Sequence, residues 1–158
     1  MEFARTIKED TNVETMKRVQ ESDKLIMDTI HGNEEAVAKQ IKKVHEETSN
    51  PLNRNSEDSL RAAIQVAFFA YKNYYLKMEE LPTGEGYADI VYLPKQGKGV
   101  PTLLVELKWN KNADSAIRQI KAKGYVDGVK DFGPEVLLVG ISYDRDTKVY
   151  ECRIEKWK

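Results

Sequence analysis

Residues 103–109 (LLVELKW) form an apolar run interrupted by two opposite charges, and this run constrains the fold more than any other feature of the sequence. Side chains alternate between the two faces of a β-strand, so Glu106 and Lys108 would share one face while Val105 and the leucines at 103 and 107 share the other. Burying an unpaired charge in such a strand costs several kcal/mol (roughly) even after relaxation. We therefore expect a strand whose charged face meets a compensating group.

The remaining elements are expected on both sides of this strand in the sequence. Apolar residues at helical spacing predict a helix that ends at Gly32, a second helix capped by Asn33, and a longer helix from Glu57 to Tyr75 capped by Ser56. Short apolar runs bounded by turn formers predict strands at 77–81, 88–93, 102–109, 136–141 and 149–154, with an amphipathic helix over 113–124. This order predicts an α/β fold, a mixed sheet with helices packed on it.

Composition limits the class of protein. The chain has 158 residues, 41% of them apolar and 32% charged, which fits one globular domain with a short helical extension. The longest apolar run, 66–71, has six residues and is far below the roughly 20 that a membrane helix needs. We expect no secretory signal, and the single Cys152 fits a reducing compartment. These features predict a cytoplasmic protein with no membrane partner.

Asp89 is a second acid in an apolar run. If residues 88–93 and 102–109 pair as a hairpin, Asp89 can approach Glu106 across the sheet. Neighbouring carboxylates repel, which raises one pKa unless a cation lies between them. Mg²⁺ (or Mn²⁺) suits the pair because it takes one or two carboxylates, waters and phosphate oxygens. Lys108, on the same face, could orient or deprotonate a water, or stabilise charge that develops on phosphorus.

An acid, then Glu-x-Lys on a strand, then a helix resembles the PD-(D/E)XK nuclease superfamily. Asp89 and residues 106–108 stand at the motif positions, although Ala88 replaces the proline of the motif. Within it, the chain resembles a bacterial nuclease-like module, usually C-terminal to an AAA-ATPase-like domain in uncharacterised proteins. The segments that carry this narrower resemblance are 55–57, 80–89, 105–110, 119–121 and 138–141, and coverage runs from about residue 15 to the end.

The resemblance implies a restriction-endonuclease-like fold, with residues 1–50 as an N-terminal helical extension and 51–158 as the nuclease-like domain. It also implies a Mg-dependent nuclease that cuts phosphodiester bonds, with DNA as the expected substrate. No phosphate-binding loop of an ATPase occurs in the chain, so the usual partner domain is not part of it.

Carried over residue by residue, the resemblance implies that Asp89 and Glu106 bind the metal and that Lys108 is the catalytic lysine. The Leu107 carbonyl could be a further ligand. Glu57 matches a helical glutamate that many members point at the metal or its water. Gln119 matches a glutamine expected near the lysine or the substrate backbone.

The distribution of charge gives modest support for nucleic-acid binding. The net charge is only −1, but residues 95–131 hold eight lysines and arginines against four acids. Each phosphate that such residues neutralise would make affinity depend on salt. Solvated surface lysines would give the same pattern, so the segment alone does not distinguish a nucleic-acid-binding surface from an ordinary solvated one.

Other interpretations of these residues remain open from the sequence. Glu106 and Lys108 could form a surface ion pair of little energetic value. Glu57 is also what helix capping favours in a first turn, and Gln119 could simply be solvated. The whole module could bind nucleic acid or regulate its ATPase partner without cutting. Apolar stripes on the N-terminal helices also allow self-association, with a homodimer as the product.

Overall fold

The computed structural model describes residues 2–50, 52, 56–83, 86–122 and 124–157. For residues 2–11, 80–83, 86–89 and 125 it describes the backbone but not the side chains. The elements, in chain order, are α1 (Glu2–Ile30), α2 (Glu34–Thr48), α3 (Glu57–Ala67), the 3₁₀ turn η1 (Phe69–Asn73), β1 (Tyr75–Thr83), β2 (Gly86–Pro94), β3 (Thr102–Trp109), α4 (Ala113–Ala122), the 3₁₀ turn η2 (Tyr125–Gly128), β4 (Val136–Asp144) and β5 (Val149–Lys156).

The five strands form one mixed sheet in the order β1-β2-β3-β4-β5. Neighbouring strands run antiparallel except β3 and β4, which are parallel. A parallel pair needs a crossover connection, and α4 supplies it. The strand that carries Glu106 and Lys108 therefore lies at the centre of the sheet.

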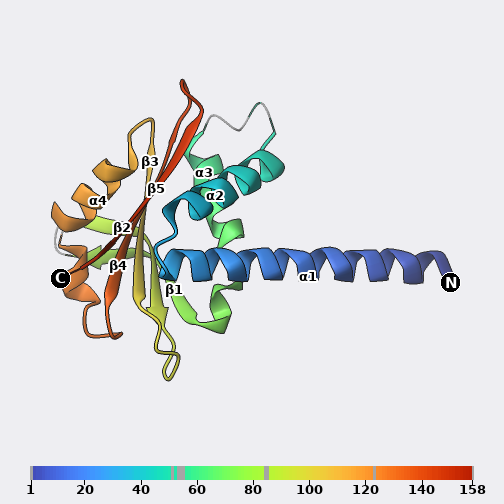
Figure 1. Cartoon of the computed structure of the whole chain (residues 1–158), viewed down its shortest axis with the longest axis horizontal. Helices are drawn as coiled ribbons and strands as arrows, with labels where there is room; N and C mark the ends of the chain where they lie inside the picture. Colours follow the sequence, from blue (N-terminus) through green and yellow to red (C-terminus); the bar gives the residue numbers. More distant parts are fainter. Residues whose placement is uncertain (1, 51, 53–55, 84–85, 123, 158) are drawn as a thin grey trace.

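Helices cover both faces of this sheet (Figure 1). On one face, buried residues of α1, α2 and α3 pack with Leu103, Val105 and Leu107 of β3. On the other face, α4 packs with Leu104 of β3 and Leu138 of β4. The period-two alternation of β3 thus divides its side chains between two cores, as the sequence predicted. The mixed sheet flanked by helices is confirmed.

The first helix, α1, begins far from the sheet and ends against it (Figure 1), whereas α2 contacts β5 from its first residue, Glu34. The C-terminal part of α1 contributes Leu25 and Ile26 to the core beneath the sheet, and α2 contributes Val37 and Ile41. Asn33 precedes α2, but its side chain does not cap the helix; instead its Nδ2 donates a hydrogen bond of 3.1 Å to Asp28. The predicted side-chain cap at this position is therefore wrong, because in the connection between α1 and α2 the Asn33 amide binds Asp28 instead.

The predicted helix over 57–75 is shorter in the structure. Ser56 caps it as expected, accepting a hydrogen bond of 3.1 Å from the backbone N–H of Ser59. The helix ends at Ala67 because Ser22 of α1 binds the backbone on either side of the break: its hydroxyl donates to the Ala67 carbonyl and accepts from the Ala70 N–H. The following residues form η1, and the chain enters β1 at Tyr75. Contacts from a distant helix override the local periodicity here.

Gly140 allows α4 to lie close to the sheet. A Cβ built on Gly140 would lie 2.6 Å from the Ala113 carbonyl oxygen and 3.0 Å from the Ala116 Cβ. Gly140 is the β4 residue paired with Glu106 in the parallel register. The absence of a side chain there therefore sets how near α4 approaches the charged face of β3.

Candidate active site

Glu106 lies at the centre of the sheet on the face covered by α4. Its exposed fraction is only 3%, although it is a carboxylate in a strand whose other residues from 102 to 107 are all buried. Buried charges are retained in proteins when partners compensate them. The expected compensating group exists, and it comes from α4.

Gln119 of α4 links Glu106 to Lys108. Its Nε2 donates a hydrogen bond to the Glu106 carboxylate, and its Oε1 accepts one from the Lys108 ammonium group. An amide has a donor end and an acceptor end, so a single side chain can satisfy a carboxylate and an ammonium group at once. Glu106, Gln119 and Lys108 form one network, which we call the central triad.

The geometry of the triad follows from its elements. Glu106 and Lys108 are two residues apart on β3 and so share a face, about 7 Å apart along the strand. Gln119 lies on the amphipathic helix α4, beside the buried residues Ile117 and Ile120 that fix α4 on the sheet. Lys108 is half-buried and Glu106 is buried, so the network opens to solvent at the lysine end. The interpretation of Glu106 and Lys108 as an exposed surface ion pair is excluded by this burial.

Asp89 belongs to β2, the antiparallel neighbour of β3. The predicted hairpin between these two runs is confirmed, with Ile90 opposite Val105 and Val91 opposite Leu104. The side chain of Asp89 lies outside the described residues. Its backbone lies one residue before Ile90 on β2.

Leu107 and Glu57 occupy different places relative to the triad. Leu107 lies between Glu106 and Lys108 in sequence and its side chain is buried in the core beneath the sheet. Glu57 is exposed in the first turn of α3, which covers the face opposite the triad. Among these described residues, no hydrogen bond or ion pair joins Glu57 to the triad.

Two residues of β4 border the triad and were not singled out as functional from the sequence. In the parallel register Gly140 stands beside Glu106, and Ser142 stands beside Lys108. Ser142 is buried. A glycine and a serine in an apolar strand carry no chemical signature, so only their register with β3 shows that they border the site.

The basic segment, residues 95–131, contains cations that form ion pairs and cations that do not. Lys121 forms an ion pair of 2.6 Å with Glu155, and Lys130 lies 3.8 Å from Asp127. Within the described residues, no ion pair is formed by Lys98, Lys111 or Arg118, all of which are exposed. Arg118 directly precedes Gln119 on α4.

The donor chemistry of the site fits a hard divalent cation. Magnesium binds through one or two carboxylates and keeps several waters, so Glu106 with one further acid would be a sufficient protein contribution. No group of three or more His, Cys, Asp or Glu that could hold a metal occurs in the described part of the chain, which does not include the Asp89 side chain. The fit of the site to such a cation therefore depends on Glu106 and on Asp89 of β2.

Comparison with known proteins identifies the family. Residues 56–153 match the model of the PD-(D/E)XK nuclease superfamily. No curated protein matches the chain, and no solved structure matches it. Among the described helices, none is both long and apolar enough to cross a membrane. The matched region contains the whole sheet up to Arg153 and the complete triad, and the chain belongs to the PD-(D/E)XK nuclease superfamily.

Proposed function

We propose that this protein is a metal-dependent nuclease that hydrolyses phosphodiester bonds, with DNA as its substrate. The observation that carries the proposal is the central triad: a buried carboxylate on β3, tied through one amide to a half-buried lysine on the same strand. The superfamily to which the chain belongs supports the same chemistry.

The metal-binding residues of this proposal are Asp89 and Glu106, with the Leu107 carbonyl as a further oxygen donor. The β2–β3 register, continued by one residue beyond Ile90 and Val105, leads to Asp89 opposite Glu106. Opposite residues of an antiparallel pair share a face, which supports the assignment. When bound there, Mg²⁺ (or Mn²⁺) supplies Lewis-acid stabilisation of charge on the phosphoryl oxygens. Glu57 is included through the resemblance alone.

We assign to Lys108 the role of binding and orienting the attacking water. Its ammonium group lies at the open end of the triad, where it can hold a water by hydrogen bonding and stabilise negative charge on a phosphate oxygen. Gln119 is a positioning residue, because its Oε1 holds the Lys108 ammonium group while its Nε2 holds Glu106. The amide thereby fixes the distance between the two charged groups.

The DNA substrate is supported by exposed cations of the basic segment, residues 95–131, in which the triad lies. Lys98, Lys111 and Arg118 are exposed and without an ion pair in the described part of the chain, so they are available to phosphates. Contacts of this kind do not read base identity, so cleavage should show weak sequence preference and fall as salt rises.

The test is cleavage of supercoiled plasmid and of a single-stranded RNA with Mg²⁺ or Mn²⁺, by the wild type and by Glu106→Gln and Lys108→Met. Glu106→Gln keeps the oxygen that accepts from Gln119 but removes the charge, and Lys108→Met keeps the apolar stem. Lys121→Met is the matched control, since it removes an exposed lysine whose partner is Glu155. We expect both triad variants to lose at least about a hundredfold in rate and the control to keep it.

The result that would overturn the proposal is equal cleavage by the wild type and both triad variants, or no cleavage by the folded wild type with either metal. The second result would favour the other function open to this fold. That function is a non-catalytic module that binds nucleic acid or regulates an AAA-ATPase-like partner.

A further inference from the structure

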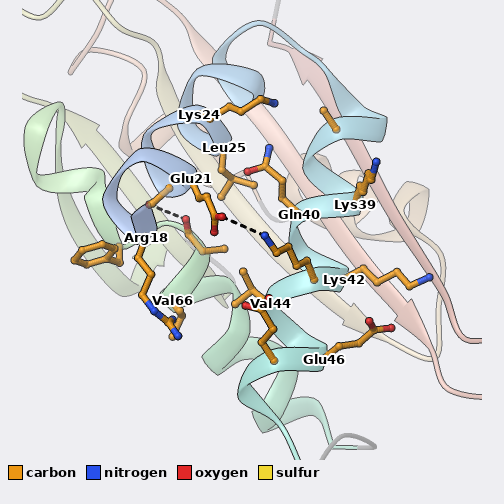
Figure 2. Close-up of a pocket in the computed structure, with 16 residues that line it drawn as sticks. Arg18, Glu21, Lys24, Leu25, Lys39, Gln40, Lys42, Val44, Glu46 and Val66 are labelled. Carbon is orange, nitrogen blue, oxygen red and sulfur yellow. Dashed lines mark hydrogen bonds and ion pairs between the residues drawn. The ribbon is translucent and has the colours of Figure 1, made fainter. Parts of the chain in front are cut away.

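A large groove lies on the side of the molecule away from the triad. It has a volume of about 930 Å³ and is bounded by α1 and α2, with the end of α3 and the start of η1 beneath (Figure 2). Its floor is apolar, made by residues such as Leu25, Val44 and Ala67. Val66 and Phe69 also line it and are 39% and 44% exposed, high values for apolar side chains. An apolar floor of this size is typical of a surface that another element covers.

The rim of the groove carries an excess of positive charge. Five cations line it (Arg18, Lys24, Lys39, Lys42 and Lys43) against three acids (Glu21, Glu46 and Glu47). Lys43 of α2 forms an ion pair of 3.1 Å with Glu21 of α1. Arg18, Lys39 and Lys42 make no ion pair within the described part of the chain. The groove therefore suits an occupant that is apolar on one side and acidic at its edges.

The N-terminal half of α1 has the matching properties. It extends away from the body of the molecule (Figure 1), and the side chains from 12 to 18 are all exposed. Val13 and Met16, one helical turn apart, are 66% and 62% exposed. Residues 9–16 (EDTNVETM) contain three acids and no basic residue. A helical segment without tertiary packing is marginally stable in water, so this half of α1 gains most from a surface that covers it.

The segment cannot reach the groove of its own chain. Val13 and Leu25 belong to the same continuous helix and lie about 18 Å apart along its axis. The occupant must then come from another molecule, and a second copy of this chain supplies both parts. Two α1 helices placed antiparallel about a two-fold axis near Val19 would lay residues 9–16 of each copy along the groove of the other. Such an isologous contact is self-complementary and closes as a dimer.

We propose that the protein forms a homodimer in which the acidic N-terminal segment of α1, residues 9–16, docks in the groove between α1 and α2 of a second copy. The apolar pair Val13 and Met16 contacts the floor, where Val66 and Phe69 are exposed. Glu14 faces the cationic rim. The dimer leaves the face covered by α4 and the triad free for substrate.

The first test is the molar mass in solution, measured by sedimentation equilibrium on the full chain from about 1 to 100 μM, a range in which a standard interface associates. We expect the wild type to be dimeric at the upper end and Phe69→Glu to be monomeric. Phe132→Glu is the matched control, because Phe132 is 59% exposed and lies outside the groove. Far-UV circular dichroism of each variant confirms that it is folded.

Charge exchange then tests which surfaces meet. One variant carries Lys39→Glu and Lys42→Glu on the rim, and the other carries Asp10→Lys and Glu14→Lys on the segment. Each alone should be monomeric, because like charges then face each other in both contacts. An equimolar mixture should form a heterodimer, in which both contacts regain opposite charges.

A wild type that stays monomeric across the range would overturn the proposal and leave the groove to a helix of another protein. A dimer that persists in Phe69→Glu would also overturn it, because the contact would lie elsewhere. Failure of the mixture to associate would exclude the docking of residues 9–16 in the groove. None of these outcomes depends on whether the triad cuts nucleic acid.

Discussion

Gly140→Ala tests how closely α4 must approach the sheet. The added Cβ would lie 2.6 Å from the Ala113 carbonyl oxygen, 3.0 Å from the Ala116 Cβ and 3.3 Å from the Ile117 Cγ1. Real contacts of this kind do not fall below 3.0 Å, and the nearest atom is backbone, which cannot rotate away. β4 is held between β3 and β5 by pairing along its full length, so α4 has to move outward.

The magnitude follows from two opposing effects. Overpacking of a well-packed core costs about 1–3 kcal/mol. Replacement of glycine by alanine reduces the entropy of the unfolded chain and recovers about 0.4–1 kcal/mol. Taking the middle of both ranges, we expect a net loss of about 1.3 kcal/mol, which for a chain of this length lowers the melting temperature by about 3–5 °C.

The assay combines thermal unfolding with the side-chain amide resonances of Gln119. Gly133→Ala is the control, because its Cβ would lie 2.8 Å from the Pro94 Cγ and so overpacks a loop away from α4. Both variants should melt earlier, but only Gly140→Ala should shift the Gln119 amide signals, since only there does α4 move relative to Glu106. An unchanged melting temperature in Gly140→Ala, or an unchanged Gln119 signal, would refute the reasoning.

The remaining predictions concern the core and the triad. Ser22→Ala should cost about 1–3 kcal/mol in urea unfolding because two buried backbone groups lose their partner, while Thr48→Ala at an exposed helix end should stay within about 0.5 kcal/mol. Burial, and secondarily the nearby Glu34 carboxylate, raises the pKa of the Cys152 thiol from 9.0 to about 12. The unfolded thiol therefore loses its proton first, so stability should fall between those pH values by about 1.4 kcal/mol per pH unit relative to Cys152→Ala; parallel pH profiles would contradict this. Gln119→Glu should lower the cleavage rate about tenfold or more because a second carboxylate then faces Glu106, and a rate equal to wild type would remove Gln119 from the site.

Much of the sheet could be predicted because its signals are local. The run at 102–109 matches β3 at both ends, and the alternation of its side chains determines which face carries Glu106 and Lys108. The β2–β3 hairpin and the helix that returns the chain to a parallel β4 follow from the order of the elements. Each of these elements is indicated by residues that are close neighbours along the chain.

The features that could not be predicted depend on distant partners. The break after Ala67 is made by Ser22, 45 residues earlier. His45 of α2 is fully buried, and its Nδ1 lies 2.5 Å from the hydroxyl of Tyr150, 105 residues away in the sequence. Glu57 also depends on distant contacts. The sequence predicts its position in the first turn of α3, but only the packing of α3 shows that this helix covers the face of the sheet opposite the triad.

Within the site, the sequence pattern identified the residue types but not their connection. Glu106 and Lys108 were expected to need a compensating group, and the resemblance suggested Gln119 near the lysine. The single amide can join both charged groups only because α4 packs close to the sheet, and Gly140 sets that distance. Whether Asp89 and Glu57 complete a metal site stays a prediction.

The measurement that tests the central claim most directly is calorimetric titration of Mg²⁺ and Mn²⁺ into the wild type and Glu106→Ala, with plasmid cleavage measured on the same samples. The account predicts that the wild type binds metal and cuts, and that the folded variant does neither. Metal binding and cleavage that persist unchanged in Glu106→Ala would contradict the assignment of the triad as the catalytic centre.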